Sequence, residues 1–193
     1  MKRYNVTVSH QARLLWYRVA KVGTRTILSH LRDAPFKLDI EEGFSLTLDP
    51  RLQEAYYSFA FVRNPWERLV SCYADKVKGG GSWLGGGLKE KPKTFDAFVE
   101  SVITQDLHTC DAHFRLQSAL IDLNTVSFVG RYESFDRDLQ KVLSNLSVPH
   151  EQPRARNVSG GGRIFRSYYT PTLVDHVASA YRRDIQIFGY SFE

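Results

Sequence analysis

The feature that most constrains the fold of this chain is a pair of short apolar runs, each of which passes through a loop into an amphipathic helix. The first run covers residues 14–20 and is broken by Lys21–Thr24, after which apolar residues recur at helical spacing. The second covers 57–62 and is followed by Asn64 and Pro65, which are typical of a helix N-cap and of the first helical position. Strands that alternate with helices predict an α/β fold with a mainly parallel central sheet, flanked by helices on both faces.

The rest of the chain continues this alternation. We expect strand and loop pieces over 34–51, a strand over 126–130, and helices over 94–104, 111–123, 134–146 and about 171–188. A chain of 193 residues is long enough for one sizeable core and too short for two ordinary domains. Residues 1–193 are therefore expected to form a single domain.

Two glycine-rich segments interrupt the pattern. Residues 78–93 contain two runs of three glycines, so the segment is either a connection without regular structure or a lid over a ligand site. Residues 149–166 carry Arg154, Arg156 and Arg163 and form either a solvated basic loop or part of the lining of a site for an anion.

Charge and cysteine content narrow the possible partners and compartments. The formal net charge of +5 favours an anionic partner, which leaves a nucleotide, an acidic glycan, a nucleic acid and a lipid surface open. Cys72 and Cys110 have no metal-ligand spacing and are too few for a disulfide scaffold, so neither a metal site nor an oxidising compartment is indicated. Residues 1–20 contain no long apolar run, and we expect neither a signal peptide nor a membrane-spanning segment.

The loop that follows the first apolar run has the composition of an anion site. In a parallel sheet, ligands lie at the carboxyl ends of the strands, where helix N-termini direct N–H groups at anions. Gly23 lets the backbone approach a phosphate, Thr24 and Thr26 offer hydroxyl donors, and Lys21 supplies a positive charge. The loop is not a Walker A motif, because its lysine precedes its glycine.

The second strand-to-helix junction carries a further pair of anion-binding side chains. Arg63 stands at the end of the strand, and Ser71 follows eight residues later, two turns into the helix. The planar guanidinium group and the hydroxyl group can reach the same anion, whereas Arg68 is expected to pair with a nearby acid.

At these two junctions the chain resembles the carbohydrate sulfotransferases of the Golgi type and their bacterial relatives. Their loop for the 5′-phosphosulfate is similar to Lys21–Thr26, and their 3′-phosphate motif is similar to Phe61–Tyr73, the longer and more specific of the two matches. Shorter similarities follow in the same order along the chain, at 94–99, 113–117, 128–133 and 181–190, so that the resemblance covers about residues 14–190.

The resemblance implies a P-loop-like three-layer sandwich that uses the sulfuryl donor PAPS (3′-phosphoadenosine 5′-phosphosulfate) and releases PAP. It implies that a sulfuryl group passes to a carbohydrate hydroxyl by in-line displacement, and that Lys21 stabilises the charge on the leaving phosphate. The residues implied for the donor are Lys21, Val22, Gly23, Thr24, Arg25 and Thr26 at the 5′-phosphosulfate, and Arg63 and Ser71 at the 3′-phosphate. Arg25 departs from the small polar residue that is usual in relatives, which puts only its own contact in question.

The general base that the acceptor hydroxyl requires is left open between two candidate places and a residue elsewhere in the chain. Some relatives have a histidine well before the arginine motif, but this chain has no histidine between His30 and His108. Glu41 and Glu42 stand near that place instead, and Glu42 is one candidate. His113 is the other, because it falls in a segment that is similar to the family.

Two other functions compete with sulfuryl transfer. A P-loop nucleotide kinase would need a Walker lysine and an acidic metal ligand, and neither is evident. A non-catalytic binder of an anionic glycan or nucleic acid would carry a broad basic stripe, whereas the informative charges here cluster at two junctions. The resemblance implies a carbohydrate acceptor, and the clustering of charge leads us to expect no nucleic-acid partner. We also expect a bacterial cytoplasmic enzyme in preference to a trimmed Golgi domain. The acceptor and the oligomeric state are not specified by the sequence.

Overall fold

The structure is a computed structural model that describes residues 2–79, 92–149 and 164–193. The chain divides into two compact units, the first made of Met1–Val62 and Leu120–Arg154, the second of Arg63–Ala119 and Ala155–Glu193. The glycine-rich stretch 80–91 and the basic connection 150–163 lie outside the described residues, so their proposed roles stay predictions.

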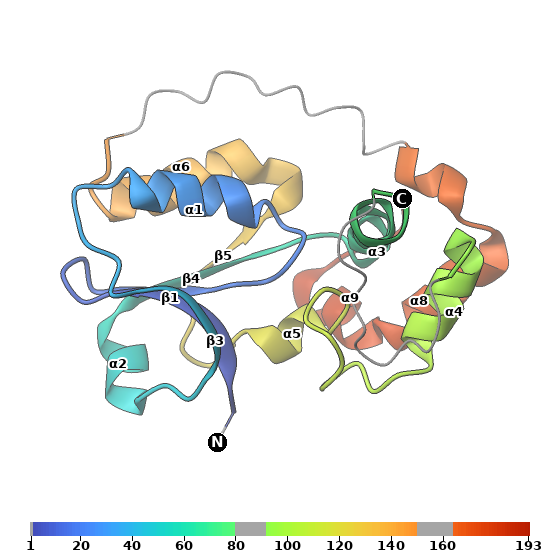
Figure 1. Ribbon diagram of the computed structural model, residues 1–193, viewed down its shortest axis with the longest axis horizontal. Helices are drawn as coiled ribbons and strands as arrows, with labels where there is room; N and C mark the ends of the chain where they lie inside the picture. The colour runs from blue at the N-terminus through green and yellow to red at the C-terminus, as the bar shows by residue number, and fades with distance from the viewer. Residues whose placement is uncertain (1, 80–91, 150–163) are drawn as a thin grey trace. The chain divides into compact units, whose positions relative to one another are not determined.

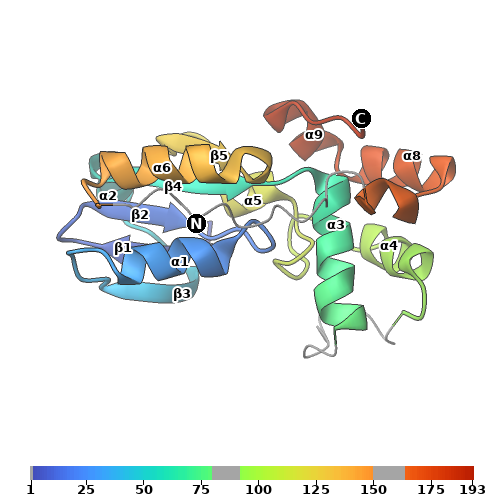
Figure 2. The ribbon, with the colours of Figure 1, turned by 90° about the horizontal axis from the view of Figure 1, so that it is seen from above.

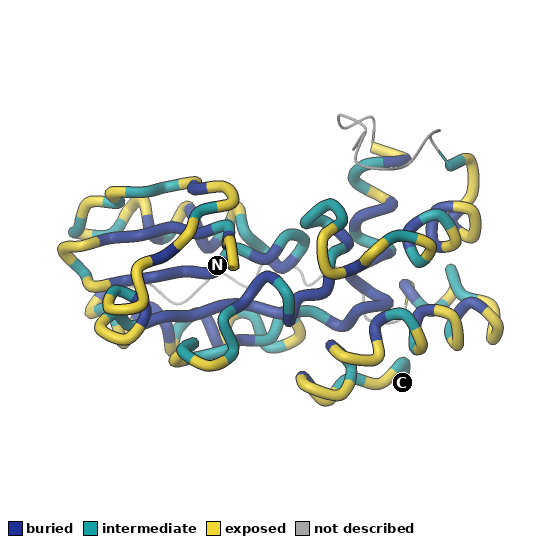
Figure 3. Tube along the Cα trace, turned by 90° about the horizontal axis from the view of Figure 1, so that it is seen from below, coloured by how far each residue is buried: buried dark blue, intermediate teal, exposed yellow. Residues whose placement is uncertain are grey.

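A five-stranded sheet forms the centre of the first unit (Figure 1). Its strand order is β3-β1-β2-β4-β5. The strands are β1 (Tyr4–Ser9), β2 (Leu14–Tyr17), β3 (Ile40–Leu46), β4 (Tyr57–Val62) and β5 (Phe128–Arg131). Figure 3 shows β2 and β4 buried along almost their whole length, as expected for central strands.

The sheet is mixed, and the expectation of a mainly parallel sheet holds for only one half of it. β2 pairs with β4 and β4 with β5 in parallel, but β1 pairs with both β2 and β3 in antiparallel fashion. The reason is the connection between β1 and β2, which is only four residues long and permits a hairpin but no crossover. The parallel half contains β2 and β4, the two strands that lead into the junctions expected to bind an anion.

Helices cover both faces of this sheet. On one face, Phe61 of β4 packs on Phe135 of α6 (Phe135–Asn145), with ring centroids 5.3 Å apart, and α1 (Thr24–Arg32) lies beside α6 (Figure 1). On the other face, Gln53 of α2 (Pro50–Ala55) donates a hydrogen bond to the hydroxyl of Tyr17. Because neighbouring residues of a strand point to opposite faces, Trp16 lies on the α6 side, where it stacks on Phe59.

The second unit is helical. Its elements are α3 (Pro65–Tyr73), a π-helical turn (Ala74–Lys78), α4 (Phe95–Ile103), α5 (Gln117–Leu120), a 3₁₀ turn (Phe165–Tyr168), α8 (Pro171–Ala180) and α9 (Arg182–Phe188). Figure 2 shows α4 beside α3 and α8, and these helices share one apolar core. Within it, Tyr73 packs edge-on against Phe95 at 5.3 Å and against Tyr168 at 6.4 Å between ring centroids.

Two of the expected helices are shorter than their patterns indicate. The helix expected over 111–123 is confined to α5, and the helix expected over 171–188 is interrupted at Tyr181, which separates α8 from α9. Tyr181 is buried, and its hydroxyl donates to the carbonyl of Phe114. Over the described ranges, no helix is long and apolar enough to cross a membrane.

Candidate functional site

The loop between β2 and α1 begins the helix with a left-handed glycine. Gly23 is the N-cap of α1 and has φ 85° and ψ 22°, a conformation that favours glycine. A Cβ atom at this position would also lie 2.6 Å from Cε2 of Phe135. The carbonyl of Gly23 accepts the first helical hydrogen bonds, from the N–H groups of Thr26 and Ile27. The N–H groups of the first turn precede the helical hydrogen-bond ladder, which makes this end of α1 suited to an anion.

The side chains of this loop differ in exposure. Val22 is buried and anchors the loop in the core of the first unit, so that only its backbone can face a ligand. Lys21, Thr24 and Thr26 are half-buried and Arg25 is exposed. Lys21 also has a positive φ of 71°, so the chain turns sharply at the residue expected to carry the charge.

Arg63 follows β4 directly and is tied to a carboxylate of the next helix. Its Nη2 atom donates to Oε1 of Glu67 at 2.9 Å, and the two side chains are only 12% and 11% exposed. Asn64 caps α3 by accepting hydrogen bonds from the N–H groups of Trp66 and Glu67, as its position before Pro65 predicts.

Glu67 and Ser71 are four residues apart on α3 and therefore lie on the same face of the helix. The structure thus places a carboxylate next to the pair expected to bind a phosphate. Glu67 is buried and in contact with Arg63, and this contact is not evident from the helical pattern.

Arg68 is fully buried and supports a loop rather than an anion. Its guanidinium group donates to the carbonyls of Ala112 and Arg115 at 2.8 and 2.7 Å. Burial lowers the pKa of Arg68, and the nearby Tyr181 and Asp184 oppose this change. Asp184 is thus an acidic neighbour of Arg68, as the sequence leads us to expect, and the two hydrogen bonds named here run to backbone carbonyls.

The loop supported by Arg68 holds a histidine and an aspartate in contact. Oδ1 of Asp111 lies 2.8 Å from Nδ1 of His113 and also accepts the backbone N–H of His113. Burial would raise the pKa of Asp111, but the hydrogen bonds from His113 outweigh it and lower the pKa below its ordinary value. With its proton on Nδ1, the His113 ring is oriented by Asp111 and presents Nε2 as an acceptor.

The alternative bases, Glu41 and Glu42, are both bound to arginines. Oε2 of Glu42 lies 3.0 Å from Nη2 of Arg18, and Oε1 of Glu41 accepts hydrogen bonds from Arg32. Both carboxylates are therefore already engaged by a cation, whereas Nε2 of His113 is not used in the contact with Asp111 named above. Local geometry therefore favours His113 over Glu42 as a proton acceptor.

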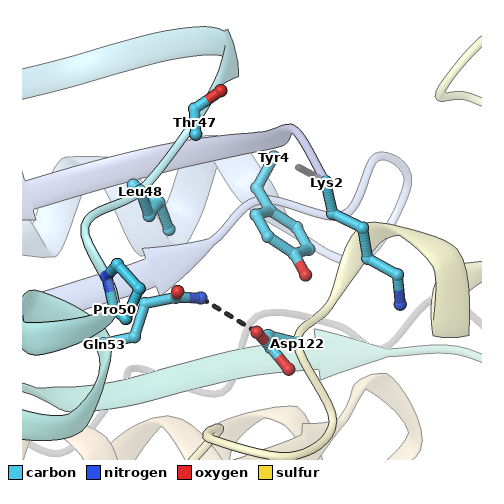
Figure 4. A pocket seen from close by; sticks show the side chains of 7 residues that line it. All are labelled: Lys2, Tyr4, Thr47, Leu48, Pro50, Gln53 and Asp122. Atoms are coloured by element: carbon cyan, nitrogen blue, oxygen red, sulfur yellow. Dashed lines mark hydrogen bonds between the residues drawn. The ribbon is translucent and has the colours of Figure 1, made fainter.

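The first unit also contains a pocket of about 230 Å³ (Figure 4). In its lining, Nε2 of Gln53 donates a hydrogen bond to Oδ2 of Asp122 at 2.9 Å. Burial and the carboxylate of Asp122 raise the pKa of Tyr4 in its wall. The remaining lining residues are Lys2, Thr47, Leu48 and Pro50, and no residue of the Lys21 loop is among them.

In the described part of the chain, no cluster of His, Cys, Asp and Glu side chains is arranged to hold a metal ion. Cys72 is buried, and burial raises the pKa of Cys110 to about 11, so this thiol is a poor nucleophile at neutral pH.

Three comparisons place this chain among known proteins. The sequence model of the sulfotransferase family matches residues 4–191. The chain is 26% identical to carbohydrate sulfotransferase 14 of Mus musculus over 205 residues, which cover 91% of this chain and 54% of the mouse protein. The Homo sapiens protein of the same name is 26% identical over 207 residues, with the same coverage. The chain thus spans about half the length of the relatives it matches. No solved structure matches it significantly.

Proposed function

Because the chain belongs to the sulfotransferase family, we propose that it transfers a sulfuryl group from PAPS to a hydroxyl group of a carbohydrate. The observation that carries the proposal is the turn at Gly23, which starts α1 at the carboxyl end of a parallel strand. Such a helix N-terminus suits the doubly charged end of a phosphosulfate. The carbohydrate acceptor is proposed from the names of the mouse and human relatives.

The two junctions are assigned different parts of the donor. In this proposal the backbone of Val22 to Thr26, together with the Thr24 and Thr26 hydroxyls, binds the 5′-phosphosulfate, and the exposed side chain of Arg25 is able to reach the donor or the acceptor. Arg63 and Ser71 bind the 3′-phosphate, with the fork of Arg63 oriented by Glu67. Lys21 stabilises the negative charge that gathers on the leaving phosphate, so that no metal ion is required for this role.

The acceptor hydroxyl must lose a proton as it attacks sulfur. In the proposed reaction its oxygen forms a bond to sulfur, the bond from sulfur to the 5′-phosphate oxygen breaks, and PAP leaves with the electron pair. The geometry of the Asp111–His113 pair supports Nε2 of His113 as the group that takes the proton. Glu42 is the second candidate, since its side chain is 42% exposed and water can replace Arg18 as the partner of its carboxylate.

Three broader assignments belong to the same proposal. The family match over residues 4–191 supports a single sulfotransferase domain, and the β2–loop–α1 junction supports a P-loop-like arrangement. A bacterial cytoplasmic location is proposed from the cysteine content alone.

The direct test is transfer from PAPS. The protein is incubated with PAPS and a panel of glycans, and both PAP release and sulfate on the glycan are measured. We expect glycan-dependent PAP release, and we expect Lys21→Ala to abolish it while the circular dichroism spectrum is unchanged. Near-normal turnover by Lys21→Ala would contradict the mechanism, and phosphoryl transfer from ATP without any use of PAPS would replace the function by that of a kinase.

A further inference from the structure

Gln117 holds the backbone of Arg63 with both ends of its carboxamide. Oε1 of Gln117 accepts the N–H of Arg63 at 2.9 Å, and its Nε2 donates to the carbonyl of Arg63 at 2.8 Å. Arg63 is the first residue beyond β4, whose paired register with β5 runs from Phe59 to Val62. Buried backbone N–H and carbonyl groups need hydrogen-bond partners. Here the carboxamide of Gln117 supplies both an acceptor and a donor, as the backbone of a neighbouring strand does in a sheet.

The backbone of Gln117 is itself held in place by the buried carboxylate of Asp184. It is fully buried, and Asp184 of α9 is fully buried as well. The two oxygens of Asp184 accept the N–H groups of Gln117 and Ser118 at 2.7 and 2.9 Å, which caps the first turn of α5. The carboxamide therefore projects from an anchored backbone, and its position is set before any ligand arrives.

We propose that Gln117 is a positioning residue for recognition of the 3′-phosphate. It fixes the backbone of Arg63, while Glu67 fixes the guanidinium fork, so that both ends of the Arg63 side chain are constrained. A fork that binds a phosphate through two parallel hydrogen bonds tolerates little displacement, and a preset backbone removes the cost of ordering it on binding. This inference rests on the proposed function, because it takes Arg63 to bind the 3′-phosphate.

The alternative role for Gln117 is purely structural, and selectivity separates the two. 5′-AMP is PAP without its 3′-phosphate, so the ratio of the two dissociation constants reports on the 3′-phosphate site alone. A general loss of stability lowers the affinity for both nucleotides and leaves this ratio unchanged. Misplacement of Arg63 lowers the affinity for PAP only.

The experiment compares Gln117→Met with Gln53→Met by calorimetric titration of PAP and 5′-AMP. Gln53 is a matched control, because it is also a buried glutamine with two hydrogen bonds through its amide group, to Tyr17 and Asp122. We expect Gln117→Met to lower the preference for PAP over 5′-AMP about tenfold, the value of one to two lost hydrogen bonds, and Gln53→Met to leave it unchanged.

A second variant covers the case in which Gln117→Met fails to fold. Gln117→Glu keeps the size of the side chain and the acceptor for the Arg63 N–H but loses the donor to the Arg63 carbonyl. Its preference for PAP should lie below that of the unmodified protein. A folded variant at position 117 that retains the full preference overturns the positioning role, whereas absence of any preference in the unmodified protein overturns the proposed function itself.

Discussion

Gly23 and Phe135 are packed so closely that a Cβ atom on Gly23 would lie 2.6 Å from the ring of Phe135. The backbone at Gly23 is also left-handed, with φ 85°. These two facts together place the loop of the proposed donor site against α6, within the same unit. Gly23 is therefore required for the backbone conformation of the loop, in addition to its proposed role of letting a phosphate approach the backbone.

Replacement of Gly23 by alanine should therefore damage both the fold and the site. We expect Gly23→Ala to lower the free energy of unfolding by about 1–3 kcal/mol, because strain at positive φ adds to overpacking against Phe135. Affinity for PAP should fall in parallel. Gly43→Ala is the control, since its Cβ would also meet side chains at 2.6 Å while its φ is not positive. Equal effects of both variants on PAP binding would refute a special role for Gly23.

The assignment of the base is tested by substitution at the two candidates. We expect His113→Ala to lower kcat about 10²- to 10⁴-fold with PAP affinity preserved, because only proton transfer is removed. Glu42→Gln should keep most of the activity, since Glu42 is engaged by Arg18. The reverse pattern, with an inactive Glu42→Gln and an active His113→Ala, would move the role to Glu42.

The contact between Asp111 and His113 makes the stability of the protein sensitive to acid. The pKa of Asp111 is lower in the folded protein than its ordinary value of 3.8, so the unfolded chain takes up this proton at the higher pH. The stabilisation that ionised Asp111 provides is complete at pH values above its ordinary pKa of 3.8, and it is lost as the pH falls through the lower pKa of the folded protein. Chemical denaturation from about pH 6 to about pH 3 should give a shallower decline for Asp111→Asn than for the unmodified protein. Equal declines would exclude this contribution.

Burial of Arg68 predicts a large structural effect without a direct role in chemistry. Arg68→Met leaves the carbonyls of Ala112 and Arg115 without these donors, and we expect a loss of about 3 kcal/mol or more in unfolding free energy. Arg32→Met is the control, because its contact with Glu41 is exposed and should contribute less than about 1 kcal/mol. A loss for Arg68→Met as small as that of the control would show that the buried guanidinium is not needed for this loop.

Local signals account for the elements that the sequence predicts well. β4 has the expected boundaries and α3 begins at the expected residue, because a continuous apolar run and an Asn-Pro start are features of adjacent residues. β1 is not evident from the pattern, since Thr7 and Ser9 are polar yet fully buried. The break at Tyr181 likewise follows from a partner far along the chain, the carbonyl of Phe114.

The same distinction applies to the candidate site. Lys21, Gly23, Arg63 and Ser71 stand in short motifs that can be identified in sequence, and their roles in binding PAPS stay predictions. Gln117 contacts Arg63 across 54 positions of the chain, and such a pairing is visible only in the folded protein. Glu67 lies within the same motif as Arg63, but its burial and its contact with Arg63 become visible only in the folded protein.

The central claim is that Arg63 and Ser71 recognise a 3′-phosphate, and titration with PAP beside 5′-AMP tests it most directly. We predict that the unmodified protein prefers PAP by about a hundredfold, the value expected for two charge-assisted hydrogen bonds, and that Arg63→Ala removes most of this preference while remaining folded. Equal affinity of the unmodified protein for PAP and 5′-AMP would contradict the account.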